Sequence, residues 1–429
     1  MYDYKMELTP EELNILEGKE GEVYGKIMKT IVMYGDTFGA SKLVPVTSQY
    51  GHLVTSFGIS IMKPVFSLMD ELLDAGVKSQ QKFTVDPRPM DFPNVPSNIL
   101  QKIFFKVMYG KQKDYEDQLN KMGLISEDGF TCTCYMDEVG NIPEMGDILS
   151  WAESSAVVYA NSVLGARCNR NSGIIEMFGS ILGKVPYFGF LTDEGRKANW
   201  IIQVKTDNLP EAQLLGSAIG MKVMEDVPYI KNLGEYFNSD LNQKSKDYLK
   251  DMGAATASNG AVGLFHVEGL TPEAKKFGEK LLVDNPKVYV IDHKELKRIK
   301  DSYPVIWKDK EAKPKVCFIG CPHLSLDQLI QWTKDIENHL KSNGLDEVLV
   351  STVLTSSTPV LDEFNKLAEA NKLKNMGVST SYICPLMFMN NPLCGKMPVI
   401  TNSNKLRTYT SSRYYTDSEI LDAITKGVV

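Results

Sequence analysis

The residues best suited to chemistry lie in the run 131–173, where small polar side chains interrupt an apolar pattern. If 151–167 is helical, Ser154 and Asn161 stand seven positions apart and share one face, and Ser155 lies on the adjacent stripe. Buried hydroxyl and amide groups need hydrogen-bond partners. The run therefore predicts an active-site wall, although a packed helix whose serines bond back to the preceding turn explains the spacing equally well.

Cysteine usage and charge narrow the class of protein. Seven cysteines are scattered over 429 residues, the N-terminus MYDYKMELTPEE lacks a signal-peptide core, and no long apolar run occurs. We therefore expect a cytoplasmic protein with no membrane segment and no disulfide framework, whose thiols are free or bind metal. The net charge of −7 and the dispersed Lys and Arg residues argue against a nucleic-acid partner.

Helix-start signals mark the N-terminal and central parts of the chain. Thr9, followed by Pro10 and then Glu12, has the pattern of a capping box. We expect further elements as follows: a helix over 22–34, strands over 42–47 and 82–91, and a helix that starts at Pro272 after the cap residue Thr271.

The charged stretch 307–315 is the best candidate for a domain boundary, which divides the chain into lobes 1–310 and 311–429. Strand and helix patterns alternate after it, and this alternation predicts an α/β lobe with a parallel sheet. Its strands are expected over 315–320, 347–353, 380–383 and 397–401, and its helices from Ser325 and over 359–375.

Two cysteines follow strands of this predicted sheet. Cys321 and Cys384 come just after the carboxyl ends of their strands, where open parallel sheets bind ligands. Asn402 and Ser403 follow another strand onto the same edge, and Arg407 comes shortly after. These side chains would offer donors to a polar or anionic substrate.

The spacing of the cysteines disfavours a zinc ribbon or finger, whose ligands come in close pairs. Cys317 lies within a strand and is expected to face the core. Cys132, Cys321 and Cys384 are either unrelated packed thiols or three thiolates of an iron–sulfur cluster. Such a cluster would keep an open position at which iron acts as a Lewis acid.

Three histidines have both a structural and a functional interpretation. His266 follows an apolar run and is either a core imidazole or a substrate contact. His323, close to Cys321, would hydrogen-bond a ligand sulfur or face solvent. His52 follows a predicted strand and is expected at the same cleft.

Several motifs in order resemble the aconitase X family. They are TCT-x-Y, a Gly-Asn-x-Pro turn, ESSAVVYANSVLGAR, DMGAATASNGAVGLFHVEGLTPEA, GCPH-x-S, a late Cys-Pro segment and PVITNS. The similarity extends over nearly the whole chain. The chain resembles the large catalytic subunit of this family, whose smaller swivelling domain would be a separate polypeptide.

The resemblance implies an aconitase-like, multi-lobed α/β architecture with parallel sheets and a hydro-lyase that dehydrates a small hydroxy acid. It also implies an iron–sulfur cluster or mononuclear iron, for which Cys132, Cys321 and Cys384 would be the ligands. The residues expected to act at the substrate site are Ser154, Ser155, Asn161, Arg167 and His266 as catalytic residues, and His52, Asn402, Ser403 and Arg407 as binding residues.

Two departures from the family pattern affect the ligand set. Cys134 stands where the family usually has Pro, so Cys132 and Cys134 are alternatives. The late cysteine lies in TSYICPLMF rather than in an Asp-Thr-Cys context, so Cys394 competes with Cys384. Aconitase-type enzymes place a catalytic serine on the swivelling domain, and this predicts that the chain needs a small partner subunit.

The resemblance offers two substrates, and we prefer cis-3-hydroxy-L-proline over mevalonate 5-phosphate. A phosphate would favour an additional Arg near the pocket, and the candidates are Arg88, Arg167, Arg170 and Arg407. In another class, a non-catalytic iron sensor that binds RNA would need a basic surface, which the acidic composition opposes. Neither GxGxxG nor GxxxxGK[ST] occurs, so no motif supports a nucleotide site.

Overall fold

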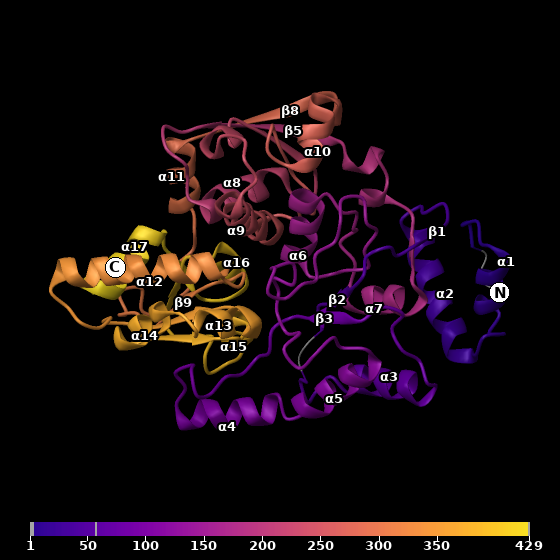
Figure 1. The fold of residues 1–429 in the computed structure, drawn as a ribbon, viewed down its shortest axis with the longest axis horizontal. Helices are drawn as coiled ribbons and strands as arrows, with labels where there is room; N and C mark the ends of the chain where they lie inside the picture. The colour runs from indigo at the N-terminus through magenta and orange to yellow at the C-terminus, as the bar shows by residue number, and fades with distance from the viewer. Residues whose placement is uncertain (1–3, 56–57, 428–429) are drawn as a thin grey trace.

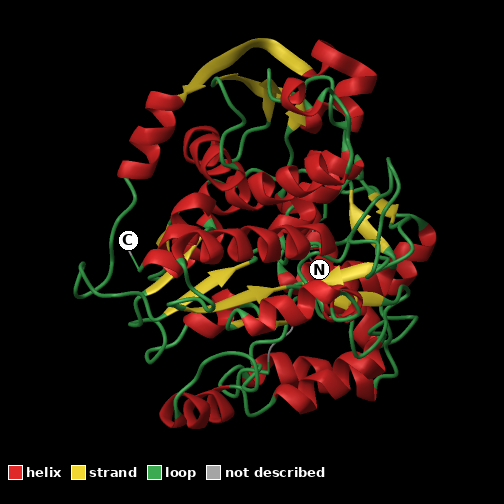
Figure 2. Cartoon of the chain, turned by 60° about the vertical axis from the view of Figure 1, so that its left-hand side comes forward, coloured by secondary structure: helices red, strands yellow, loops and turns green. Residues whose placement is uncertain are grey.

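Two parallel β-sheets form the frameworks of the central and C-terminal parts of the chain in the computed structural model, which describes residues 4–55 and 58–427. The helices α8 (Ala212–Val223) and α9 (Gln243–Asn259) lie between these two sheets in both views (Figures 1 and 2). The mixed α/β class with parallel sheets is therefore confirmed. Within the described ranges, no helix combines the length and apolar character needed to cross a bilayer.

The C-terminal sheet is parallel throughout, in the order β11-β10-β9-β12-β13. Its central strand β9 has four consecutive buried residues, VCFI, as expected for a strand covered on both faces. Cys317 lies in this strand and is buried, as predicted. The strands are β9 (Val316–Ile319), β10 (Ser351–Thr355), β11 (Val378–Ser381), β12 (Val399–Thr401) and β13 (Arg413–Tyr414).

The strands β10 and β11 lie a few residues from their predicted positions. The strand β13 was not predicted, because it is only two residues long. The helix predicted over 359–375 is two helices, because Leu367 between them is extended and its side chain packs against the core. Ser325 and Gln328 form the capping box that starts the next helix, as predicted. The helices are α12 (Leu326–Asn343), α13 (Thr358–Phe364), α14 (Ala368–Asn375), α15 (Pro385–Met389), α16 (Asn404–Tyr409) and α17 (Asp417–Lys426).

The central sheet has the order β7-β6-β5-β8, and its strands are also parallel. The paired helices α8 and α9 approach closely through glycine, because a Cβ at Gly216 would lie 2.2 Å from the carbonyl oxygen of Met252. The other elements of this part are β5 (Ala198–Lys205), β6 (Pro228–Lys231), β7 (His266–Val267), β8 (Leu282–Asp292), α10 (Pro272–Phe277) and α11 (His293–Asp301). The segment 302–315 that follows contains neither helix nor strand, and the domain boundary placed there stays a prediction.

The N-terminal part is mainly helical, with two small sheets, β1–β4 and β2–β3. Thr9 and Glu12 form the predicted capping box. The two strand predictions are confirmed in shorter form as β1 and β3. The elements are α1 (Pro10–Leu16), α2 (Glu22–Thr37), α3 (Lys63–Asp74), α4 (Ile99–Met108), α5 (Gln112–Met122), α7 (Gly173–Leu182), β1 (Leu43–Pro45), β2 (Gly51–Leu53), β3 (Phe83–Val85) and β4 (Lys184–Pro186).

The helix predicted over 151–167 is shorter than expected. It is α6 (Ser154–Tyr159), continued by a π-helical turn over 160–164. The start is later because Glu153 is extended and its side chain accepts a hydrogen bond from the Ala156 N–H, which caps the helix. The turn ends at a left-handed glycine, Gly165, after which the chain leaves the helix axis.

A buried arginine ties this π-helical turn to the central sheet. The Arg196 guanidinium donates to Glu273 at 2.8 Å and to the carbonyl oxygen of Asn161 at 3.0 Å. The His266 ring lies 2.9 Å from the Arg196 carbonyl oxygen, and burial lowers the pKa of His266 to about 4, so the ring is neutral near pH 7. Asn161 and His266 are thus held by a structural network around one buried ion pair.

Replacing Glu273 by Gln is expected to lower the free energy of unfolding by about 3–5 kcal/mol, because the fully buried Arg196 would lose its counter-charge. The matched control is Glu279→Gln, which breaks an exposed ion pair with Lys231 and should shift the urea midpoint far less, because water screens exposed charges. The shift of the urea midpoint measures both. Equal shifts would contradict the role assigned to the buried pair.

Candidate active site

A cavity of about 440 Å³ brings together the three cysteines predicted as ligands. Cys321 enters it just after β9, Cys384 as the N-cap of α15, and Cys132 from the segment between α5 and α6. Residues from the N-terminal part and from the C-terminal lobe both line the cavity. The lining residues used below are Asp86, Cys132, Glu153, Ser154, Arg170, Cys321, His323, Cys384, Lys405 and Tyr409.

The alternative cysteines do not line this cavity. Cys134 is buried beside the His52 ring, and Cys394 is buried with its backbone N–H bonded to the Asn391 side chain. Of each pair of alternatives, the thiol that lines the cavity and is available to a bound group is Cys132 rather than Cys134, and Cys384 rather than Cys394.

The three cavity thiols have raised pKa values. Burial raises the pKa of Cys132 and Cys321, although the Lys405 ammonium opposes this effect. Burial, together with the nearby Cys321, raises the pKa of Cys384 to about 12. Without a cation the thiols therefore stay protonated, whereas bound iron would favour the thiolates.

The donor set fits a cluster better than a single ion. Among residues 4–55 and 58–427, no three His, Cys, Asp or Glu side chains converge closely enough to bind one metal ion. In an iron–sulfur cluster the thiolates are shared among more than one iron atom, so the sulfurs need not converge on one point. Three thiols around one cavity, with none from a tight pair, match that requirement.

His323 joins the segments that carry two of these cysteines. Its backbone N–H donates to Cys132 Sγ at 3.5 Å, and its ring lies 3.0 Å from the Ile383 carbonyl oxygen, next to Cys384. The other ring nitrogen lies 3.1 Å from Thr131 Oγ1. The sulfur contact is therefore made by the backbone, and the ring fixes the two loops. Burial lowers the pKa of His323 to about 4, which keeps it neutral.

A buried ion pair forms one wall of the cavity. Lys405 Nζ contacts Glu153 Oε1 and lies 3.2 Å from Ser155 Oγ, which in turn donates to Glu153 Oε2 at 2.7 Å. Burial alone would raise the pKa of Glu153, but Lys405 and these hydrogen bonds lower it to about 2. Both groups are therefore charged near neutral pH, and Ser155 is bonded to both.

A second titratable pair lies behind Asp86. His52 Nε2 is 3.4 Å from Asp86 Oδ1, and His52 Nδ1 is 2.9 Å from Thr84 Oγ1. Burial raises the pKa of Asp86 to about 6, against the opposing effect of His52. His52 thus reaches the cavity through Asp86, which lines it, rather than directly.

Of the catalytic and binding residues implied by the resemblance, only Ser154 lines the cavity. Arg167 donates to the Leu191 carbonyl oxygen at 2.8 Å, outside it. Asn402 donates to Asp417 at 2.8 Å, and Ser403 caps α16 and donates to the carbonyl oxygen of Cys321. Like Asn161, His266 and Arg407, these side chains have protein partners and do not themselves line the cavity.

Sequence reasoning missed three charged residues of the cavity as site residues: Asp86, Glu153 and Lys405. Two of them had a usable signal. Glu153 is the first residue of the ESSAVV run, where an acidic side chain favours a helix N-terminus. Lys405 directly follows Asn402–Asn404 on the predicted sheet edge.

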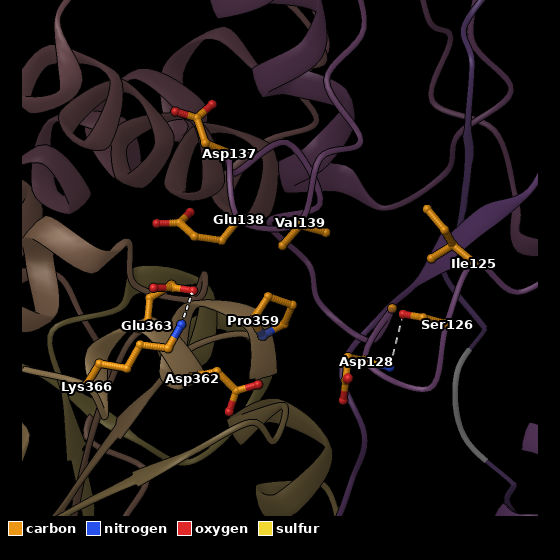
Figure 3. Close-up of a pocket in the computed structure, with 11 residues that line it drawn as sticks. Ile125, Ser126, Asp128, Asp137, Glu138, Val139, Pro359, Asp362, Glu363 and Lys366 are labelled. Carbon is orange, nitrogen blue, oxygen red and sulfur yellow. Dashed lines mark hydrogen bonds and ion pairs between the residues drawn. The ribbon is translucent and has the colours of Figure 1, made fainter.

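Two pockets of larger volume lack the thiols that line this cavity. One of about 660 Å³ lies between the 125–139 segment and α13 (Figure 3), and one of about 800 Å³ lies near α12 and α17. Both contain several carboxylates and no cysteine. In the hollow of Figure 3, Lys366 is already bonded to Glu363. Neither is suited to an anionic substrate.

Comparison with known proteins gives the relatives of the chain. It is 31% identical to the phosphomevalonate dehydratase large subunit of Methanocaldococcus jannaschii over 97% of each chain. It is 25% identical to the cis-3-hydroxy-L-proline dehydratase of Pseudomonas aeruginosa over 92% of this chain and 65% of that one. The crystal structure of Thermococcus kodakaraensis aconitase X in its holo-form superimposes with a TM-score of 0.79 and 28% identity, covering 98% of this chain and all of that one.

Family models agree with these similarities. The model of the aconitase X first domain matches residues 5–194, and that of the aconitase X second domain matches residues 198–301. Together they cover more than half of the chain; Cys132 and Glu153 of the cavity lie within the first, whereas Cys321, Cys384 and Lys405 lie beyond both. The chain belongs to the aconitase X family.

Proposed function

We propose that the chain is the large subunit of a phosphomevalonate dehydratase, a hydro-lyase that removes water from mevalonate 5-phosphate. The observation that carries the proposal is one cavity lined by three thiols, with an adjacent buried Lys–Glu ion pair. The relatives support this substrate over cis-3-hydroxy-L-proline, the substrate preferred from sequence, because the phosphomevalonate dehydratase shares 31% identity and the hydroxyproline enzyme 25%. Both relatives are named dehydratases, which also favours an enzyme over an iron-sensing binding protein.

Cys132, Cys321 and Cys384 would hold an iron–sulfur cluster in this cavity. When bound, the cluster supplies a Lewis-acidic iron that makes a substrate hydroxyl a better leaving group. The lining supports this assignment, because the Lys405 ammonium lies close enough to Cys132 and Cys321 to favour their thiolates. The backbone N–H of His323 also donates to the sulfur of Cys132.

The protein's own charged groups orient the substrate and handle protons. Lys405 presents a fixed positive charge to a substrate carboxylate, and Glu153 and Ser155 hold its ammonium in place. Asp86, whose pKa burial raises to about 6, accepts or releases a proton at the carboxyl group, and His52 lies 3.4 Å behind it. These roles make Lys405 and Asp86 the binding and proton-transfer groups of this chain.

A small subunit is part of the proposal. The relative from Methanocaldococcus jannaschii is named a large subunit, and the hydroxyproline relative is longer than the region matched here. A partner that covers the cavity would exclude water and supply the catalytic serine expected from the family resemblance. The decisive assay is turnover of mevalonate 5-phosphate, with cis-3-hydroxy-L-proline as the competing substrate, by the complex purified without oxygen.

Replacing Cys321 by Ser is expected to remove most of the iron and acid-labile sulfide and to abolish dehydration, because one ligand of the cluster is lost. Iron and sulfide per chain, with the visible absorption spectrum, measure the effect. Cys317→Ser is the matched control, since Cys317 is buried in β9, four residues away, and does not line the cavity. A full iron complement in Cys321→Ser would remove it from the ligand set.

Replacing Lys405 by Met is expected to reduce kcat/KM by at least about 100-fold and stability by about 3–5 kcal/mol, because Glu153 stays buried without its counter-charge. The double variant Lys405→Met with Glu153→Gln removes the buried charge and should recover most of the stability but not the activity. Urea unfolding and steady-state kinetics separate the two effects. Recovery of activity in the double variant would show that Lys405 has only a structural role.

A further inference from the structure

The four arginines that could bind a phosphate are distinguished by their partners. Arg88 is bonded through two nitrogens to the Glu116 carboxylate, at 3.1 and 3.0 Å, and its guanidinium lies over the Phe130 ring. Arg167 is paired with Asp193 and bonded to the Leu191 carbonyl oxygen. Neither arginine lines the cavity, and both are already neutralised by a carboxylate.

Arg407 is also committed elsewhere. Its guanidinium donates to Asn404 at 2.8 Å and to Asn259, and it lies 4.0 Å from the centre of the Tyr303 ring. It does not line the cavity. Its contacts with Asn404 and Asn259 join α16 to α9.

Arg170 differs from the other three arginines both in its position and in its lack of a partner among the described residues. It lines the cavity, and within the described part of the chain its guanidinium has neither a hydrogen bond nor an ion pair with a protein group. Tyr409, which is half exposed, lines the same cavity. A partly buried guanidinium with no protein partner is an anion-binding group, because its five N–H donors are arranged for an oxyanion.

A glycine provides the space in which the Arg170 stem lies. A Cβ at Gly263 would lie 3.0 Å from both Cγ and Cδ of Arg170 and 2.6 Å from Cε2 of Phe190. The backbone at Gly263 is itself fixed, because Asn161 Nδ2 donates to its carbonyl oxygen at 2.8 Å. The absence of a side chain at Gly263 therefore determines where the guanidinium can reach.

The charge balance of the cavity also points to an anion at Arg170. The Lys405 ammonium is already compensated by Glu153, whereas Arg170 has no paired carboxylate. A substrate whose only anionic group is a carboxylate facing Lys405 would therefore leave Arg170 without an anionic partner. A substrate with a carboxylate at one end and a phosphoryl group at the other has a partner for each.

We propose that Arg170, seated against Gly263, binds the phosphoryl group of the substrate and thereby selects mevalonate 5-phosphate over hydroxy acids without a phosphate. This inference rests on the proposed function and extends it to a residue. The guanidinium would donate two parallel hydrogen bonds to phosphoryl oxygens, while Lys405 faces the carboxylate.

The test uses the complete complex and two ligands that differ only in the phosphate. In Arg170→Met, the KM for mevalonate 5-phosphate is expected to rise roughly 10- to 100-fold. The inhibition constant of unphosphorylated mevalonate, used as a competitive inhibitor, should stay within about 2-fold, since it lacks the group that Arg170 binds. Arg298→Met, which removes an exposed arginine paired with Glu295, is the matched control and should change neither value.

A second variant tests whether the space beside Gly263 positions the Arg170 side chain. Gly263→Ala leaves the guanidinium in the chain but displaces its stem, and it should reproduce the selective rise in KM at smaller size. Iron content and the far-ultraviolet spectrum verify that each variant is folded and loaded.

The outcomes separate the two proposals. If the wild-type complex does not turn over mevalonate 5-phosphate, the proposed function is overturned and the phosphate assignment with it. If the wild type is active but Arg170→Met changes the KM and the mevalonate inhibition constant by the same factor, Arg170 binds the part that both ligands share and the phosphate assignment alone fails. Unchanged values in that variant would remove Arg170 from the site.

Discussion

The buried ion pair between Glu153 and Lys405 is the interaction on which the site depends. Its partners lie 252 positions apart in the chain, one at the start of α6 and the other in α16. Each charge would be unfavourable in this environment without the other. The pair therefore joins α16 to the N-terminus of α6 at one wall of the cavity that the three cysteines line.

Contacts beside this pair extend the same junction. Ser403 donates to the carbonyl oxygen of Cys321, and Asn404 donates through its backbone N–H and its side-chain amide to Gln213 of α8. The loop after β12 thus supports the Cys321 loop from one side, while His323 connects it to the loops of Cys132 and Cys384. The cysteines come from separate loops, but these hydrogen bonds connect the loops to one another. A rigid lining of this kind suits a group that must be held at several points.

Much of the C-terminal lobe could be predicted from the sequence, because its signals are local. The Ser325 capping box and the alternation of strands and helices require only neighbouring residues. The position of Cys321 and Cys384 at one sheet edge followed from the parallel topology. Arg196, by contrast, shares a network with Asn161 and Glu273, residues 35 and 77 positions away, and no local pattern reveals this. The polar residues of the buried helical run were therefore predicted to form a site. The fold uses some of them, such as Asn161, in structural contacts instead.

The distribution of the site along the chain has a consequence for biosynthesis. Cys132 and Lys405, which share one cavity, are separated by nearly two thirds of the chain, and Lys405 lies among the last 25 residues. Domains fold progressively as the polypeptide leaves the ribosome. The cavity therefore cannot close until α16 has been synthesised, and a chain truncated before α16 would present three cysteines without their cationic neighbour. Loading of any group that these cysteines hold within the closed cavity would have to follow the synthesis of α16.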